Sequence, residues 1–224
     1  MQERGDSIEL NEPGQFIQQL SIWALPTIFA IILHEVMHGV VARALGDDTA
    51  ARAGRLTLNP LSHIDPIGTI ALPAILLFLH LPVFGYAKPV PVNFARLRNG
   101  RAGMGMVAAA GPLTNLALAL LSGMAAHALV PMARGEFGPI VAVPLIYMAQ
   151  ASVIINVVLM VFNLFPLLPL DGGRVLAALL PLEAARAYSR LEPYGFLILL
   201  LLLYTNWVSA IIDPIINTLA RAIL

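Results

Sequence analysis

Long apolar stretches with few charges dominate the chain, and short polar connections separate them. The stretches lie at about residues 16–45, 66–85, 104–131, 140–165 and 196–216. Each is close to or longer than the ~20 residues that a helix needs to cross a bilayer. The runs lack the alternation of a membrane-spanning strand, and only helices and closed barrels satisfy their backbone in lipid. The pattern therefore predicts an all-α polytopic membrane protein.

Two connections differ from ordinary loops. Residues 54–69 read GRLTLNPLSHIDPIGT, with leucines in alternation, and this pattern predicts a strand or β-hairpin near the membrane surface. Residues 85–101 are basic and contain two prolines, which favours an extended backbone. The other connections are too short for a soluble domain. The sequence thus predicts one integral-membrane domain over residues 1–224.

The composition supports this interpretation. Hydrophobic residues make up 58% of the chain and charged residues 12%, whereas soluble domains average ~25% charged residues. The net charge is zero and the chain has no basic run, so nothing indicates a nucleic-acid partner. Cysteine is absent. A metal ion would therefore be held by His, Asp or Glu.

The apolar stretch at 16–45 contains two histidines and a glutamate in the sequence HEVMH, at residues 34–38. Histidines at i and i+4 lie on one helical face about one turn apart, so His34 and His38 can reach one tetrahedral zinc ion. Glu35 lies beside this face, where it can take a proton from a coordinated water and pass it to a leaving amine. The motif predicts a zinc site with a general base.

The same side chains could instead be core polar residues that are hydrogen-bonded between helices. However, three ionisable groups within one turn of an apolar helix are costly at low dielectric unless a metal or close partners compensate. The metal site is therefore the preferred interpretation.

A catalytic zinc site needs a third protein ligand. Asp171 is the preferred candidate because it stands in the segment 163–174, NLFPLLPLDGGR, where prolines end a helix and a glycine pair follows the carboxylate. A broken helix at membrane depth is tolerated only where it lines a cavity or is buried in protein. His80 and His127 lie in apolar stretches without an acidic neighbour, and each is expected to be a packed or interfacial histidine. His63, in a turn-rich loop, is a weaker candidate for contact with the site.

Three patches resemble the site-2 proteases, a family of intramembrane zinc proteases that cleave transmembrane helices. The first is HEVMH at 34–38. The second, NLFPLLPLDGG at 163–173, is similar to the family's Asn-x-x-Pro-x-x-Pro-Leu-Asp-Gly motif. The third, AGPLTN at 110–115, is similar to Gly-Pro-x-x-Asn at the start of the family's middle core helix. The resemblance covers about residues 20 to 180.

This resemblance implies a fold. Three helices, at about 16–45, 104–131 and 140–180, would form the catalytic core, with accessory helices around it. The segment Arg55–Asp65 would form a short membrane-associated β-hairpin that presents the substrate as a strand. The chain has no room for a PDZ or CBS domain.

The resemblance also implies roles for single residues. Zn²⁺ would be held by His34, His38 and Asp171, with Glu35 as the catalytic residue. Asn163 would bind the substrate backbone or the oxyanion, and Asn115 would help to hold the unwound substrate. The partners would be the lipid bilayer and a transmembrane-helix protein substrate, cleaved in regulated intramembrane proteolysis.

Three other functions are considered. An ion-binding transporter can also contain broken helices and intramembrane carboxylates, but the chain shows no pair of matching halves. A catalytically inactive scaffold could keep zinc as a structural ion, although it would not need Glu35. A membrane zinc protease for soluble or prenylated peptides would be expected to use a glutamate as third ligand, and Glu183 and Glu192 lack a suitable context.

The metal site also constrains the membrane topology. The 34–38 motif and Asp171 can meet only if the stretch 66–85 enters the membrane and returns to the same side, either as a re-entrant segment or as a tight helical hairpin. Of the thirteen Lys and Arg residues, this arrangement leaves only Arg4, Arg134 and Arg221 outside. The positive-inside rule favours that asymmetry. We therefore expect a bacterial or archaeal cell membrane, with the active site towards the cytoplasm.

Overall fold

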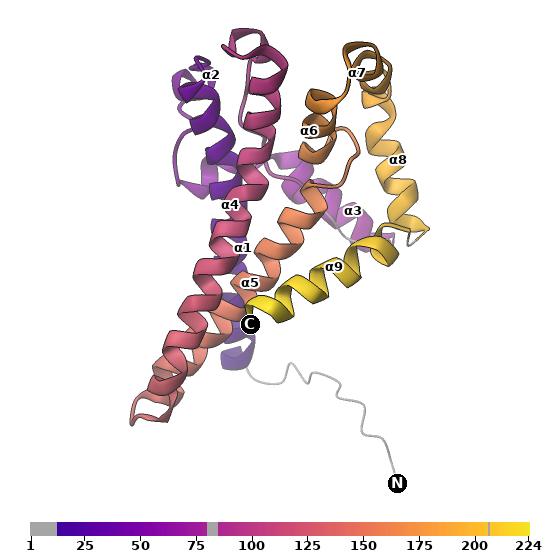
Figure 1. Cartoon of the computed structure of the whole chain (residues 1–224). Helices are drawn as coiled ribbons and strands as arrows, with labels where there is room; N and C mark the ends of the chain where they lie inside the picture. The colour runs from indigo at the N-terminus through magenta and orange to yellow at the C-terminus, as the bar shows by residue number, and fades with distance from the viewer. Residues whose placement is uncertain (1–12, 80–84, 206) are drawn as a thin grey trace.

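The computed structural model describes residues 13–79, 85–205 and 207–224, and helices build this part of the chain (Figure 1). Its core consists of α1 (Pro13–Ala44), α4 (Gly100–Leu129) and α5 (Val143–Asn163), which pack against one another. With the single turns that adjoin them, they form apolar helical spans of 28, 35 and 26 residues. At 1.5 Å per residue, even the shortest exceeds the ~30 Å hydrocarbon thickness of a bilayer.

The remaining helices are shorter and lie around this core. They are α2 (Thr49–Arg52), α3 (Leu72–Phe78), α6 (Asp171–Leu179), α7 (Leu182–Ser189), α8 (Glu192–Tyr204) and α9 (Trp207–Ile223). Single turns of 3₁₀- or π-helix are η1 (Pro60–His63), η2 (Pro66–Ala71), η3 (Phe94–Arg96), η4 (Val130–Arg134) and η5 (Gly138–Ala142). The expected C-terminal helix at 196–216 is thus two helices, and α9 folds back onto α5 (Figure 1).

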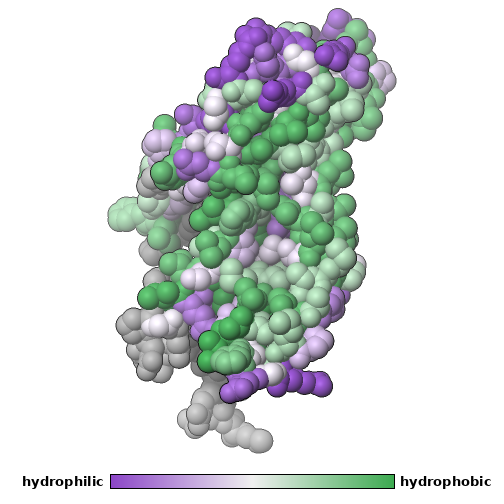
Figure 2. Space-filling model, turned by 90° about the vertical axis from the view of Figure 1, so that its left-hand side faces the viewer, coloured by the Kyte–Doolittle hydropathy of each residue, from purple (hydrophilic) through white to green (hydrophobic). Residues whose placement is uncertain are grey.

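The surface identifies the surroundings of the helices as lipid. Figure 2 shows a broad hydrophobic band between polar ends. Many large apolar side chains of the described residues are exposed, among them Phe78, Ile140 and Leu179, each more than 75% exposed. Such a band would be unfavourable in water, because each large apolar side chain that stays exposed to water forgoes the ~1.5–3 kcal/mol that its burial would contribute. Together with the three spanning helices, it defines an integral membrane protein.

The expected β-hairpin at Arg55–Asp65 is wrong, because the described residues contain no β-strand. In its place, the chain from Gly54 to Asn59 is irregular and leads into η1. The alternation of Leu56 and Leu58 does not reflect a sheet with one buried face, since Leu58 is 55% exposed.

Local hydrogen bonds explain why no ladder forms there. The side chain of Thr57 accepts from the backbone N–H of Asn59, and the side chain of Asn59 accepts from that of Leu61. At the end of the segment, the side chain of Asp65 accepts from the backbone N–H groups of Ile67 and Gly68. Short polar side chains thus take the backbone donors that a strand partner would need.

An extended segment, residues 85–93, lies along the loops that follow α1. The N–H of Tyr86 donates to the carbonyl of Gly68 at 3.1 Å, and the N–H of Lys88 donates to the carbonyl of His63 at 2.9 Å. Arg55 donates to the carbonyl of Lys88 at 2.7 Å. Residues 86–88 therefore lie beside residues 63–68, so the chain returns close to the point where η2 and α3 begin. Residues 80–84 of the expected 66–85 stretch lie outside the described part.

Asp47, directly after α1, anchors the far end of this segment. Its carboxylate is fully buried and accepts from the backbone N–H of Asn93 at 2.6 Å and from the hydroxyl and N–H of Thr49. Burial alone would raise the pKa of Asp47. The hydrogen bonds from Thr49 and Asn93, with the nearby charge of Arg96, outweigh burial and lower this pKa below its ordinary value.

The first prediction concerns this anchor. Asp47→Ala removes a buried carboxylate that accepts from Asn93 and Thr49. Because hydrogen bonds to a charged group are lost, the free energy of unfolding should fall by about 1–3 kcal/mol. Thermal unfolding in detergent micelles at neutral pH measures this loss. Because the folded-state pKa is lowered, the contribution of Asp47 is present above the ordinary carboxyl pKa and is lost as the pH falls through the folded value.

The control is Asp47→Asn, which cannot ionise. The difference in stability between the parent protein and this variant should shrink as the pH falls from 7 towards 3. A difference that stays constant over this range would show that the Asp47 carboxylate does not need its charge.

Candidate metal centre

The metal centre is built on one face of α1. His34 and His38 follow each other by one turn, are both buried, and have ring centroids 4.7 Å apart. Asp171, the first residue of α6, faces them. Its Oδ2 atom lies 3.2 Å from Nε2 of His34 and 3.3 Å from Nε2 of His38. The structure thus brings together the three residues that the sequence suggested as ligands.

Hydrogen bonds fix which nitrogen of each imidazole carries the proton. Nδ1 of His34 lies 2.6 Å from Oδ1 of Asn115, and Nδ1 of His38 lies 2.7 Å from the carbonyl of Val107. Both partners accept, since the amide nitrogen of Asn115 is engaged elsewhere, so each Nδ1 is the donor. The Nε2 lone pairs of both rings are therefore free to bind a metal, and the rings are held in place.

Asp171 is positioned by a turn that glycines allow. A Cβ at Gly172 would lie 2.1 Å from the carbonyl oxygen of Leu164, and one at Gly173 would lie 2.5 Å from the backbone nitrogen of Leu168. The glycine pair thus lets the start of α6 lie directly against the loop that leaves α5. At the other end of α6, Arg101 of α4 donates to the carbonyls of Ala177, Ala178 and Leu180. These bonds satisfy carbonyls that a helix end leaves free.

The middle of α4 leaves room for an ion. A Cβ at Gly111 would lie 2.5 Å from Nε2 of His38 and 2.6 Å from Nε2 of His34. Only glycine at this position leaves space in front of the two ligand nitrogens. The helix therefore passes the site closely without filling it.

The donor set fits zinc. Two neutral imidazoles and a carboxylate are ligands that Zn²⁺ binds, and bond lengths of 2.0–2.1 Å in a tetrahedron separate ligand atoms by ~3.3 Å. The two Nε2–Oδ2 distances match this spacing. Oδ2 of Asp171 is buried and receives no hydrogen bond from the described part of the chain. Three lone pairs thus converge without a proton between them, and a bound cation would satisfy them.

Glu35 stands next to the ligand face. Its Oε2 atom accepts a hydrogen bond of 2.9 Å from the backbone N–H of Val90, in the extended segment 85–93. The side chain is partly exposed, unlike the two histidines that flank the position. The segment therefore holds one oxygen of this carboxylate in place.

Asn115 of the 110–115 motif and Asn163 of the 163–173 motif differ in their surroundings. Asn115 is fully buried between α1, α4 and α5, and its contacts are to His34, Ala30 and Asn156. Asn163 is the last residue of α5 and is partly exposed, with its amide nitrogen donating to the carbonyl of Leu159.

Among the described residues, the two other histidines, His63 and His127, are not part of the ligand group. His63 is buried, and its Nε2 atom lies 2.9 Å from the carbonyl of Thr57. His127 is exposed near the end of α4. His80 lies outside the described residues.

Two contacts of the site were not expected from the sequence. Asn156 of α5 is buried next to Asn115. The sequence does contain a signal for this residue, because a polar amide in the middle of an apolar stretch indicates a functional position. The contact of Val90 is made by its backbone, so its residue type carries no signal.

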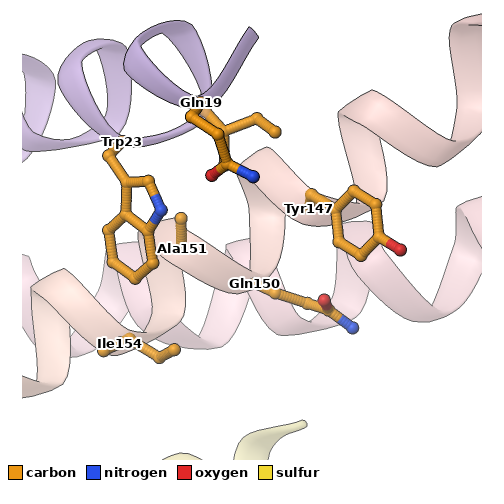
Figure 3. Close-up of a pocket in the computed structure, with 7 residues that line it drawn as sticks. Gln19, Trp23, Tyr147, Gln150, Ala151 and Ile154 are labelled. Atoms are coloured by element: carbon orange, nitrogen blue, oxygen red, sulfur yellow. The ribbon is translucent and has the colours of Figure 1, made fainter. Parts of the chain in front are cut away.

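A groove between the N-terminal halves of α1 and α5 is separate from this centre (Figure 3). Gln19, Ile22, Trp23, Tyr147, Gln150, Ala151 and Ile154 line its ~200 Å³. Trp23 precedes His34 by eleven residues, which corresponds to ~16 Å along a helix. The groove therefore lies at the opposite end of α1 from the ligands.

A helical membrane bundle that holds a His-Glu-x-x-His pair and a facing aspartate defines a class, the membrane-embedded zinc metalloproteases. Comparisons with known proteins agree. The model of peptidase family M50 matches residues 124–205. The Bacillus subtilis protein named "Putative zinc metalloprotease YwhC" is 37% identical over 88% of this chain and 86% of its own length.

Mycobacterial relatives give the same result. Proteins named "Putative zinc metalloprotease Rip2" from Mycolicibacterium smegmatis and Mycobacterium tuberculosis are 32% and 30% identical, and the matches cover 70–71% of their lengths. No solved structure matches the chain significantly. The chain belongs to peptidase family M50, the site-2 proteases, and zinc is the metal of this family.

The second prediction follows from the space at Gly111. Gly111→Ala places a methyl group against both Nε2 atoms, so zinc affinity should fall by about 100-fold, the upper end of the cost of changes around metal ligands. Competition with a chromophoric chelator measures the affinity of the purified protein.

Gly103→Ala is the matched control on the same helix, because the nearest neighbours of its Cβ would be the side chains of Leu97 and Asn99, at 3.2 Å or more. It should keep the parent affinity. Equal affinities for both variants would mean that the ion does not bind in front of Gly111.

Proposed function

We propose that the protein is an intramembrane zinc protease that hydrolyses peptide bonds within or near transmembrane segments of membrane proteins. The observation that carries this proposal is the meeting of His34, His38 and Asp171 inside the helical bundle, with Glu35 beside them. His34, Glu35 and His38 lie within the spanning part of α1, and Asp171 is the first residue of α6.

In this proposal, His34 and His38 bind the ion through Nε2 and Asp171 binds it through its carboxylate. When bound, zinc acts as a Lewis acid that lowers the pKa of a coordinated water towards ~7 and polarises a carbonyl oxygen. Asn115 and the carbonyl of Val107 keep the imidazoles oriented, as outer partners do in other zinc sites. The contacts of Asn115 favour this role over direct contact with an unwound substrate.

Glu35 is the proposed proton carrier. The hydrogen bond from Val90 fixes Oε2, so that the second oxygen is directed to the reactants. The carboxylate takes a proton from the attacking water and delivers it to the nitrogen of the scissile bond as that bond breaks. The leaving group is then a neutral amine.

The substrate class follows from the position of the site in the membrane. A peptide bond in a transmembrane helix is shielded by its own hydrogen bonds, so a substrate must unwind locally before attack. Asn163, at the end of α5 and partly exposed, is the amide proposed to bind the freed backbone or the oxyanion. Regulated intramembrane proteolysis is the process that this chemistry suits.

Two other functions make different demands on Glu35. An ion-binding transporter or a catalytically inactive zinc scaffold would use the three ligands, but neither needs a carboxylate that is held beside them by a backbone donor. The arrangement of Glu35 and Val90 therefore favours hydrolysis.

We further propose that the chain between α1 and α4 enters the membrane and returns to the same side. The hydrogen bonds that join Tyr86 to Gly68 and Lys88 to the carbonyl of His63 support this path. The described helical part, Pro66–Phe78, has 13 residues and would extend ~20 Å, less than a bilayer. The active site would then face the cytoplasm, where most of the Lys and Arg residues gather.

The third prediction tests the mechanism. Glu35→Gln removes the proton carrier and keeps the ligands, so cleavage of a model transmembrane peptide should fall by about 10²- to 10⁴-fold while zinc stays near stoichiometric. His34→Ala, His38→Ala and Asp171→Ala should lose both zinc and activity. Proteolysis in detergent or liposomes, with metal analysis of the same samples, measures the two quantities.

Two results would contradict the mechanism. Near-normal cleavage by Glu35→Gln would remove the general base. Zinc retained in full by Asp171→Ala would show that Asp171 is not a ligand.

The fourth prediction tests the topology and uses the absence of natural cysteines. Single cysteines at Asn93 and Arg174 should react with a membrane-impermeant maleimide only from the cytoplasmic side. A cysteine at Arg134, between α4 and α5, should react only from the opposite side. Labelling of Asn93→Cys from outside, with Arg174→Cys labelled from inside, would exclude the re-entrant path.

A further inference from the structure

A chain of hydrogen bonds continues from the metal site into the centre of the bundle. It starts at His34 of α1 and passes to Asn115 of α4. From Asn115, Nδ2 donates to Oδ1 of Asn156 in α5 at 2.8 Å. Asn156 in turn donates to the carbonyl of Ser152 at 2.9 Å and to its hydroxyl at 3.2 Å, and that hydroxyl lies 2.8 Å from the hydroxyl of Ser122. Asn115 and Asn156 are 0% and 1% exposed.

The direction of each bond between Ser152 and His34 follows from the carbonyl group of Ser152. A backbone carbonyl only accepts, so the NH₂ group of Asn156 must face Ser152. The oxygen of Asn156 then faces Asn115, and only an NH₂ group can meet it. The oxygen of Asn115 is thereby turned to His34 and requires a proton on Nδ1 of that ring. Nε2, the nitrogen that faces Asp171, is left with its lone pair.

We propose that Asn156 is a positioning residue of the zinc site, which acts through Asn115 to set the tautomer of His34. This inference rests on the zinc ligation proposed above. If the amide of Asn115 turned over, two carbonyl oxygens would face each other at Asn156. His34 would then carry its proton on Nε2, which cannot bind zinc. In the apolar interior, no bulk water relieves either mismatch.

A second contact limits the size of the effect. Nδ2 of Asn115 also donates to the carbonyl of Ala30, at the longer distance of 3.4 Å. This bond supports the same orientation of Asn115. Loss of Asn156 should therefore weaken metal binding without abolishing it.

The experiment measures metal affinity of the purified full chain by chelator competition, and the coordination of Co²⁺ by its visible absorption. Asn156→Leu has a similar volume without polar atoms and should weaken affinity by about 10-fold, the lower end for outer partners of metal ligands. Asn156→Asp, protonated in this buried setting, keeps an acceptor for Asn115 and a donor for Ser152. It should restore the parent affinity and the parent Co²⁺ spectrum.

Two controls separate positioning from general stability. Ser122→Ala removes the last hydroxyl of the chain without touching Asn115 and should leave affinity unchanged. In an Asn115→Ala background, Asn156→Leu should have no further effect on affinity, because the residue that transmits its influence is gone. If Asn156→Leu does not fold, Asn156→Ala takes its place in both backgrounds.

The outcomes are decisive in either direction. Unchanged affinity in Asn156→Leu, or a loss that is equal with and without Asn115, would overturn the proposal. The readout is metal affinity, so it does not depend on proteolysis. A protein that binds zinc with this dependence on Asn156 but cleaves no peptide would refute the proposed function and leave the inference standing.

Discussion

The constraint on which the structure depends is that a charged metal site must be satisfied inside an apolar bundle. Each polar atom there needs a partner from the protein, since lipid offers none. In this structure, residues whose side chains or backbone are restricted by their contacts form the site. The imidazoles donate to an amide and a carbonyl, glycine at position 111 leaves space for the ion, and a glycine pair sets the start of α6 beside it. Ligand geometry is thus fixed by the contacts of the core helices.

The same contacts also hold the helices together. Between transmembrane helices the hydrophobic effect contributes little, because lipid is as apolar as the side chains. Small residues and interhelical hydrogen bonds therefore determine how α1, α4 and α5 align. Asn115 of α4 contacts both of the other helices, α1 through His34 and Ala30 and α5 through Asn156. A shift of one helix along another would break the metal site and the packing at once, so stability of the bundle and geometry of the site are coupled.

The sequence predicted the parts of the site that depend on local spacing. His34 and His38 are neighbours on any helix, and the Pro and Gly residues around Asp171 indicated a break that could direct it inward. The predicted hairpin at Arg55–Asp65 was wrong because the alternation of leucines does not determine which acceptors the backbone N–H groups bind. The side chains of Thr57, Asn59 and Asp65 accept from nearby N–H groups instead. The contacts of Asp47 and Val90 join residues more than forty positions apart. No local pattern encodes such pairs.

The extended segment 85–93 connects the loop after α1 to Glu35, beside the candidate metal centre. Asp47 holds one end of it, Arg55 and the carbonyl of His63 hold Lys88, and the N–H of Val90 reaches Glu35 between these anchors. Prolines at positions 89 and 91 restrict the backbone on both sides of that donor. The position of this donor is therefore set by the fold. A carboxylate held by a rigid main-chain donor loses little freedom when it accepts a proton, so this arrangement would preorganise Glu35 for the proposed acid–base role.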